Sequence, residues 1–378
     1  FGMSFSEAGV HTIAEITLVL ILAADASRIS VPSLLRFRSI PVRLLLIALP
    51  LTIAFGAAVG KGLLPELLWI EAALIAAILA PTDAALGASV LAEKSVPLRI
   101  RQSLNVESGL NDGIALPAVL FFACFLNLSH QSGETNWVVF LTLQLTLGPL
   151  IGIAAGWIGG QAIGFSASRG WITETYQGVA AMALAVLAFA FAEGVGGNGF
   201  IAAFACGMTY GNLKVAYSHF LYEFTETESE VLSQLTFLLF GLVLLPQSLT
   251  IVTPQIVLYA FASLTLVRML PTALAMAGLK LHLPSLAFLG WFGPRGLASL
   301  LFALLVLEDL EVPSAGLIQS IVAVTVLMSI VLHGASAGVL SRAYGRWAKK
   351  STSDACPENE APVATGVMMV EGHPNPAE

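Results

Sequence analysis

The chain has 378 residues, of which 57% are hydrophobic and only 11% are charged, and its formal net charge at pH 7 is -7. A soluble domain carries about a quarter charged residues because its surface faces water, so this composition excludes an ordinary soluble fold. The basic residues form no patch interleaved with aromatic residues, which excludes a nucleic-acid partner. The three cysteines lack metal-ligand spacing, so neither zinc nor disulfides are expected, and no cofactor is predicted.

Apolar stretches recur along most of the chain, each near the length of about 20 residues that crosses a bilayer. Their number predicts an all-α integral membrane protein with about eleven transmembrane helices. The expected spans are residues 11–30, 43–60, 67–92, 102–126, 136–164, 176–193, 197–213, 231–250, 255–278, 284–306 and 314–341. Residues 1–345 are expected to form one transmembrane domain, and the hydrophilic residues 346–378 a disordered tail.

The lysines and arginines lie in alternate loops, as the positive-inside rule requires of a multi-pass protein. The loops on one side contain Arg28, Arg36, Arg38, Arg43, Lys94, Arg99, Arg101, Arg169, Lys214, Lys280, Arg342, Arg346, Lys349 and Lys350. The intervening loops contain only Lys61. This pattern predicts a cell-membrane protein whose amino end is outside and whose tail is cytoplasmic.

Glycines recur at every fourth position in the span 136–164, at Gly152, Gly156, Gly160 and Gly164. Small residues at this spacing are typical of helices that pack closely in a membrane. The sequence leaves open whether this contact forms within one chain or between two.

An ionisable residue at mid-membrane costs at least about 3 kcal/mol, so such residues are candidates for function. In residues 80–84, Pro81 interrupts an apolar span because proline lacks the amide donor and clashes with the preceding turn. Unwinding would free carbonyl oxygens beside the Thr82 hydroxyl and the Asp83 carboxylate, which are hard donors suited to a cation. The alternative is a plain kink in which Asp83 caps the second half-helix.

Residues 105–113 contain a second polar group within an apolar stretch. Ser108 and Asp112 share one helix face, and Glu107 and Asn111 share the neighbouring face. One face could present an ion site while the other anchors the structure. A cytoplasmic loop is the alternative, but the apolar sequence that follows places this segment near mid-depth.

Arginines also lie inside apolar spans. Arg295, between Pro294 and Gly296, needs an acid partner, and we expect Glu107 to be that partner. Pairing with Asp83 or Asp112 is the alternative. Two further candidates have weaker support: Asp25 lies three residues before Arg28, so a local ion pair explains it equally well, and Arg268 is expected either to snorkel or to find an acid.

These segments resemble those of the monovalent cation:proton antiporters, the NhaP-like sodium/proton exchanger family. Residues 80–83 look like the family's unwound Thr-Asp segment, and residues 293–296 are similar to its arginine helix. Residues 107–113 look like its Asn-Asp motif, which is the most specific match. The resemblance covers nearly the whole chain.

The resemblance implies a homodimer whose protomers each combine a dimerisation domain with a core domain, in which two interrupted helices cross at mid-membrane. It also implies helices ahead of the first span, so the antiporter fold is expected to lack its first helices. It assigns ion and proton binding to Asp112, with Asp83, Thr82 and Ser108 as further ligands of a monovalent cation. Asn111 before Asp112 resembles the electroneutral branch.

The expected function is therefore secondary transport, not enzymatic catalysis: exchange of sodium, or another monovalent cation, for protons across a lipid membrane. Desolvation favours a protonated carboxyl group and a bound cation favours the ionised one, so a single buried acid holds either a proton or a cation. The alternatives are a potassium- or calcium-preferring exchanger, a channel, and a regulatory membrane module without transport.

Overall fold

The computed structural model describes residues 7–29, 31, 39–128, 137–213, 231–308 and 314–351, and within these ranges all regular structure is helical. Among the described residues, seven helical stretches are long and apolar enough to cross a membrane, and three further apolar helices are shorter. Every predicted span overlaps helices of the structure, so the all-helical membrane architecture is confirmed. The number of crossings stays a prediction, and most of the predicted tail lies outside the described residues, although α17 continues to Ser351.

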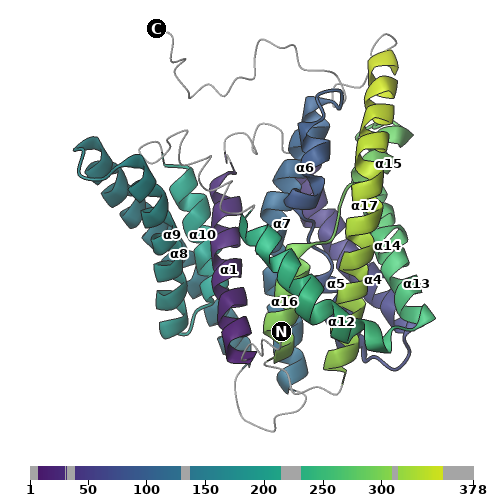
Figure 1. Ribbon diagram of the computed structural model, residues 1–378, viewed down its shortest axis with the longest axis horizontal. Coiled ribbons are helices and arrows are strands. Elements are labelled where there is room, and N and C mark those ends of the chain that lie inside the picture. The colour runs from purple at the N-terminus through teal and green to yellow at the C-terminus, as the bar shows by residue number, and fades with distance from the viewer. Residues whose placement is uncertain are drawn as a thin grey trace.

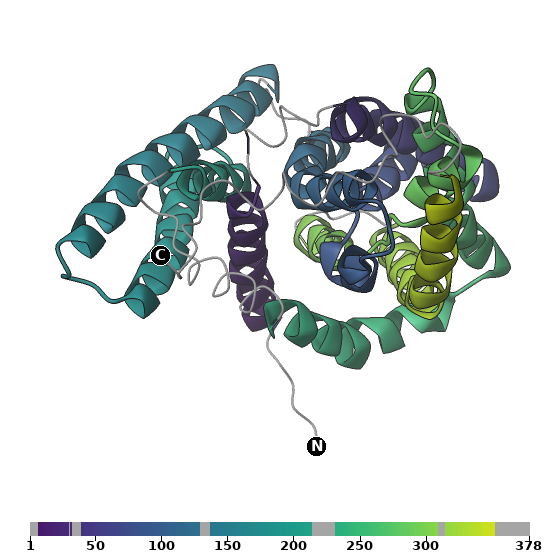
Figure 2. The same cartoon turned by 90° about the horizontal axis from the view of Figure 1, so that it is seen from above.

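The helices form two groups, which are seen separately from above in Figure 2. The first group, which we call the α8–α10 group, contains α1 (Glu7–Ser27), α8 (Trp137–Ser168), α9 (Glu174–Gly194) and α10 (Gly199–Gly211). Within it α10 packs against the three others. Large apolar side chains on the outer faces of α8 and α9 are exposed, among them Leu150, Trp157, Leu187 and Phe191. Such faces are suited to lipid or to a partner chain.

The second group, which we call the crossing group, surrounds two interrupted helices (Figure 1). Its elements are α3 (Ser39–Arg43), η1 (Leu44–Ala48), α4 (Leu49–Leu63), α5 (Trp69–Ile78), α6 (Ala84–Ala92), α7 (Leu98–Leu128), α13 (Pro254–Leu264), α14 (Leu266–Ala275), α15 (Leu283–Trp291), α16 (Leu297–Glu308) and α17 (Ala315–Ser351). A further helical stretch, Val231–Ile251, begins near α1 and runs along the edge of the crossing group (Figure 2). It includes η2 (Phe240–Leu244), α12 (Leu245–Ser248) and η3 (Leu249–Ile251). Helix α1 contacts both groups, since it also touches α7 and α16.

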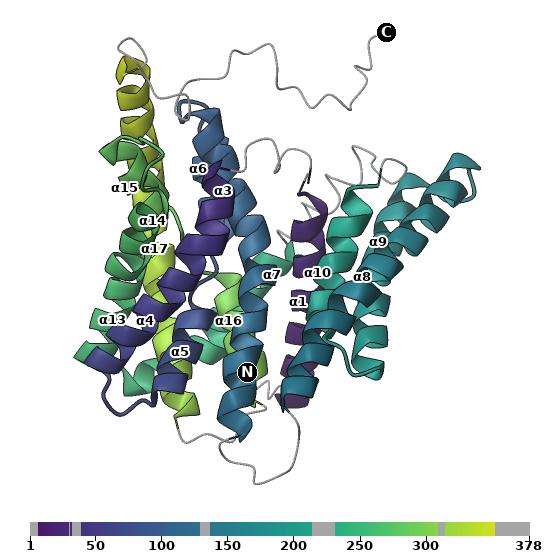
Figure 3. The same ribbon diagram turned by 180° about the vertical axis from the view of Figure 1, so that it is seen from behind.

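The described basic loops point toward the same end of the molecule: those beside α3, α6 and the end of α17 are near one another, and the loop between α8 and α9 is on the opposite side (Figure 3). Arg43 donates hydrogen bonds to the carbonyls of Ala275 (3.2 Å) and Ala277 (2.7 Å), which joins the start of one helix to the end of another. Near the same end, the backbone N–H of Ser95 lowers the pKa of the Glu93 carboxyl, with help from its hydroxyl and from the charges of Arg342 and Lys349. The alternating loops of the sequence therefore share one end of the molecule. Which side of the membrane they face stays a prediction.

The glycine repeat of α8 packs within the protomer. A Cβ atom at Gly152 would meet the carbonyl oxygen of Ala202, and one at Gly156 would lie 2.5 Å from the carbonyl oxygen of Cys206. A Cβ at Gly160 would lie 3.0 Å from the ring of Tyr210. All three neighbours are on α10, so the repeat brings these two helices into backbone contact.

We expect Gly156→Ala to destabilise the protein by about 1–3 kcal/mol, because the added methyl group meets backbone that cannot move aside. Gly334→Ala on α17 is the matched control, since a Cβ there meets no described atom within 4 Å. Alanine is also the better helix former, so this control should be neutral or slightly stabilising. Thermal unfolding in detergent measures both. Equal stability of the two variants would contradict the close packing of α8 on α10.

Candidate functional site: the crossing of two broken helices

Two helices are interrupted, and their breaks lie next to each other in space. Residues 79–83 separate α5 from α6, and residues 292–296 separate α15 from α16. Pro81 lies in the first break and Pro294 in the second, and neither proline supplies the amide that would continue its helix. The backbone N–H of Asp83 donates to the carbonyl of Pro294 (2.8 Å), so the two breaks are joined directly. The interruption predicted at Pro81 is confirmed.

Asp83 binds the amino ends of both second half-helices. Its carboxylate accepts hydrogen bonds from the backbone N–H of Leu297 (2.7 Å) and of Leu86 (3.3 Å). A helix amino end carries a partial positive charge and unpaired N–H groups, and a carboxylate satisfies both. A Cβ at Gly296 would meet this carboxylate, so a larger residue there would displace it. The capping role of Asp83 is therefore confirmed and extends to a second helix.

Arg295 binds a helix carboxyl end, whereas Asp83 binds helix amino ends. It is fully buried, and its guanidinium donates to the carbonyls of Ala80 and Pro81 (3.1 Å for the latter), just past the carboxyl end of α5. Carbonyls at a helix end carry partial negative charge, which a cation neutralises. The crossing thus places a carboxylate against two positive helix ends and a guanidinium against a negative one.

The predicted salt bridge between Glu107 and Arg295 is wrong. Glu107 on α7 pairs with Arg268 on α14 (2.5 Å), and both side chains are almost fully buried. Arg268 also lies against the second break, since a Cβ at Gly293 would be 2.5 Å from its Nε. Arg295 finds backbone carbonyls as partners instead of an acid. Of the two expectations for Arg268, the pairing is confirmed.

The segment 105–113 is neither a loop nor unwound. It lies within α7, which is continuous from Leu98 to Leu128, so Glu107 and Asp112 do not sit on an interrupted helix. The Asn111 side-chain amide donates to the hydroxyl of Thr82 (2.6 Å) and to its carbonyl (3.3 Å). The hydroxyls of Thr82 and Ser108 are 3.1 Å apart. A buried polar cluster of Thr82, Ser108 and Asn111 therefore joins α7 to the first break.

Asp112 follows this cluster on α7 and is only 8% exposed. Its Oδ1 atom is buried and accepts no hydrogen bond from any residue that the structure describes. The acids that interact with it electrostatically are Asp25 and Asp83. The neighbouring Gly113 packs against the ring of Phe204 on α10, where the two helix groups meet. Burying an ionised carboxylate oxygen without a hydrogen-bond donor costs free energy, and a proton or a bound cation would lower that cost.

Other predicted residues have separate roles. Asp25 forms the expected local ion pair with Arg28 at the end of α1. His333 and Ser329 on α17 were not predicted, yet Ser329 hydrogen-bonds Arg295 in the second break and His333 hydrogen-bonds Trp291, the residue just before it. The signal available in the sequence was the spacing of Ser329, His333 and Ser336 on one helix face inside an apolar span.

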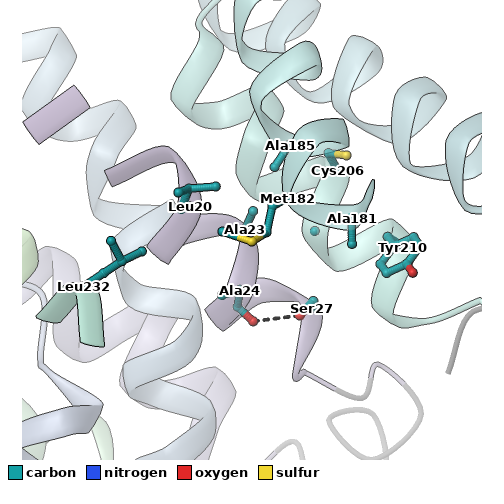
Figure 4. A pocket seen from close by; sticks show the side chains of 11 residues that line it. Leu20, Ala23, Ala24, Ser27, Ala181, Met182, Ala185, Cys206, Tyr210 and Leu232 are labelled. Carbon is teal, nitrogen blue, oxygen red and sulfur yellow. Dashed lines mark hydrogen bonds between the residues drawn. The ribbon is translucent and has the colours of Figure 1, made fainter. Parts of the chain in front are cut away.

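The cavity in Figure 4 is a separate feature, enclosed by α1, α9, α10 and Leu232. Its lining is mostly alanine and other apolar side chains, and the Ser27 hydroxyl is bonded to the carbonyl of Ala24 (2.8 Å). No charged side chain of the described residues lines it. Among the described residues it therefore offers a cation hydroxyl oxygens from Ser27 and Tyr210 but no carboxylate.

The chain is similar in sequence to known membrane proteins. The family model described as "Sodium/hydrogen exchanger, transmembrane" matches residues 2–343. The K(+)/H(+) antiporter NhaP2 of Shewanella oneidensis is 25% identical over 279 residues, which are 73% of this chain and 48% of that protein. The probable Na(+)/H(+) antiporter C3A11.09 of Schizosaccharomyces pombe is 27% identical over 372 residues, covering 86% of this chain and 47% of that protein.

The fold is also that of a solved antiporter. The sodium proton antiporter MjNhaP1 from Methanocaldococcus jannaschii superposes with a TM-score of 0.75 at 21% identity, covering 90% of this chain and 88% of that one. The chain spans about half the length of the curated relatives it matches. Members of the matched family are transporters and not enzymes, in agreement with the prediction. This multi-pass membrane protein therefore belongs to the sodium/hydrogen exchanger family.

Proposed function

We propose that this protein exchanges a monovalent cation, sodium, for protons across the membrane, without net charge movement, by competition at Asp112. The observation that carries the proposal is the buried Asp112 carboxylate, whose Oδ1 has no donor among the described residues and which adjoins the crossing of two broken helices. Ionisable groups placed so deep in a membrane are typical of ion pathways and proton relays.

In this mechanism Asp112 carries either a proton or the cation. The hydroxyls of Thr82 and Ser108, 3.1 Å apart, supply neutral oxygen ligands next to it. Asp83 adds negative charge at the site and holds the two half-helix amino ends. Asn111 keeps Thr82 in place from α7. A cation with one carboxylate, or a proton on it, leaves the site in the same charge state, which is why we propose electroneutral exchange.

Coupling requires that the site changes sides only when it is occupied. Transporters of this kind move one rigid group of helices against another around a midplane site on broken helices. Here the crossing group contains the site, and the α8–α10 group meets it near Gly113 and Phe204. We propose the first as the moving core and the second as the dimerisation side of a homodimer, with lipid on the remaining apolar faces and the tail in the cytoplasm.

Potassium is the second candidate cation, and the relatives named as K(+)/H(+) antiporters favour it. The described oxygen donors of the site suit either ion, because sodium and potassium are both hard cations that prefer oxygen. The two candidates differ only in which ion drives proton movement.

Proton flux in proteoliposomes, measured for sodium, potassium and lithium at several pH values, tests the proposal. We expect the KM for the coupled cation to rise as the pH falls, by up to about tenfold per pH unit where protons occupy the site, because the two ligands exclude each other by mass action. The maximal rate at saturating cation should change much less.

A KM that is independent of pH would contradict competition at one carboxylate. Cation flux without proton movement would instead support a channel. Potassium-driven but not sodium-driven flux would select the second candidate. Stimulation of exchange by an imposed membrane potential would contradict the electroneutral stoichiometry.

A further inference from the structure

Helix α17 carries a polar stripe that faces the second break. The hydroxyl of Ser329 accepts a hydrogen bond from the backbone N–H of Arg295 (2.7 Å). The imidazole Nε2 of His333 lies 2.9 Å from the carbonyl of Trp291, the last residue of α15. The indole N–H of Trp291 donates to the hydroxyl of Ser336 (2.9 Å). Ser329 and His333 are at most 1% exposed, so these contacts form away from water.

Both ring nitrogens of His333 have partners. Nε2 faces the carbonyl of Trp291, and because a carbonyl oxygen only accepts, Nε2 donates in this contact. Nδ1 lies 3.0 Å from the carbonyl of Ser329 and 3.2 Å from its hydroxyl, which also accepts from the Arg295 amide. His333 and Ser329 therefore connect the Arg295 amide to the carbonyl of Trp291.

An extended backbone inside a membrane protein must have its N–H and carbonyl groups satisfied by the protein. On one side of the second break, the N–H of Asp83 donates to the carbonyl of Pro294, and the Asp83 carboxylate accepts from the N–H of Leu297. On the other side, Ser329 satisfies the N–H of Arg295, and His333 is a second donor to the Trp291 carbonyl, which also accepts from the Gly293 N–H (2.8 Å). The break is thus held between the first broken helix and α17.

We propose that Ser329 and His333 are positioning residues for the exchange reaction, which hold the second break so that Arg295 and Asp83 reach the ends of the half-helices. This inference rests on the proposed exchange function. Neither residue touches the cation or the transported proton. Their loss loosens the framework of the site and leaves its ligands in place.

Four variants in proteoliposomes test the proposal. Ser329→Ala should lower the maximal exchange rate roughly tenfold, because it leaves the buried N–H of Arg295 without its acceptor. His333→Leu should lower it about threefold or more, because the Trp291 carbonyl then keeps only the bond from the Gly293 N–H. The KM for the cation should stay within about twofold, since no ligand is removed. His333→Gln retains an uncharged N–H donor for Trp291 and should restore at least about half the wild-type rate. Thr325→Val, equally buried on α17 but bonded only to its own helix at Ile321, should behave as the wild type.

Full activity of Ser329→Ala, or a His333→Gln variant as impaired as His333→Leu, would overturn the positioning role. Hydrogen exchange followed by mass spectrometry on the purified protein gives a second readout, independent of transport. Amides of residues 291–297 should exchange at least roughly tenfold faster in Ser329→Ala than in Thr325→Val. Unchanged exchange there would refute the hydrogen bonds themselves. Absence of cation-driven flux in the wild type would instead refute the proposed function.

Discussion

Replacing Asp112 by asparagine should reduce cation-driven proton movement to the level of protein-free liposomes. The amide has nearly the same shape as the carboxyl group, so the helix and its contact with Phe204 are preserved. It neither releases a proton nor balances the charge of a cation, and both are required at a buried site that exchanges them. The loss should appear in the maximal rate at every pH and should not be recovered by raising the cation concentration.

Two further variants make this result specific. Glu174→Gln neutralises an exposed acid at the start of α9 and should leave exchange unchanged. Asp112→Glu keeps the carboxylate on a longer side chain, so we expect exchange with an altered cation KM. Exchange that persists in Asp112→Asn would remove position 112 as the carrier and transfer that role to Asp83, the other acid at the crossing.

Replacing Glu107 by glutamine should destabilise the protein by about 3–5 kcal/mol, the usual cost of leaving a buried charge without its partner. The Arg268 guanidinium, 1% exposed, would keep its charge with no described acid in contact. In Glu107→Gln/Arg268→Gln both charges are gone, so we expect much of the lost stability to return. Thermal unfolding in detergent and the yield of monodisperse protein measure both.

A double-mutant cycle separates the observed pairing from the one predicted from the sequence. The coupling between Glu107→Gln and Arg268→Gln should be strong, because the two groups are in contact at 2.5 Å. The coupling between Glu107→Gln and Arg295→Gln should be smaller, since Arg295 binds the carbonyls of Ala80 and Pro81. A larger coupling with Arg295 would contradict the arrangement of the crossing.

Much of the site was predictable because its signals are local. Pro81 within an apolar span marks a break wherever the helix is placed, since the missing amide is a property of the residue. The apolar sequence after residue 113 places Asp112 within the membrane by length alone. The spacing of Ser108, Asn111 and Asp112 assigns them to adjoining helix faces before any packing is known.

Other contacts depend on which helices become neighbours. Arg268 and Arg295 are both lone arginines in apolar spans, and no local signal indicates which of them meets Glu107. The same holds for the glycines of α8, whose partner is α10 of the same chain, and for His333, whose partners lie on the second break.

The sequence by itself determined that this is a helical membrane protein with an interruption at Pro81 and an acid, Asp112, at membrane depth, and the resemblance of its motifs to an exchanger family assigned the two to one site. Composition, proline and helical spacing act over a few residues and do not depend on the rest of the chain. Only the tertiary structure decided that Asp83 caps two helices, that Glu107 binds Arg268, and that α17 holds the second break. Those choices are made by distances between segments far apart in the chain, which short-range patterns do not encode.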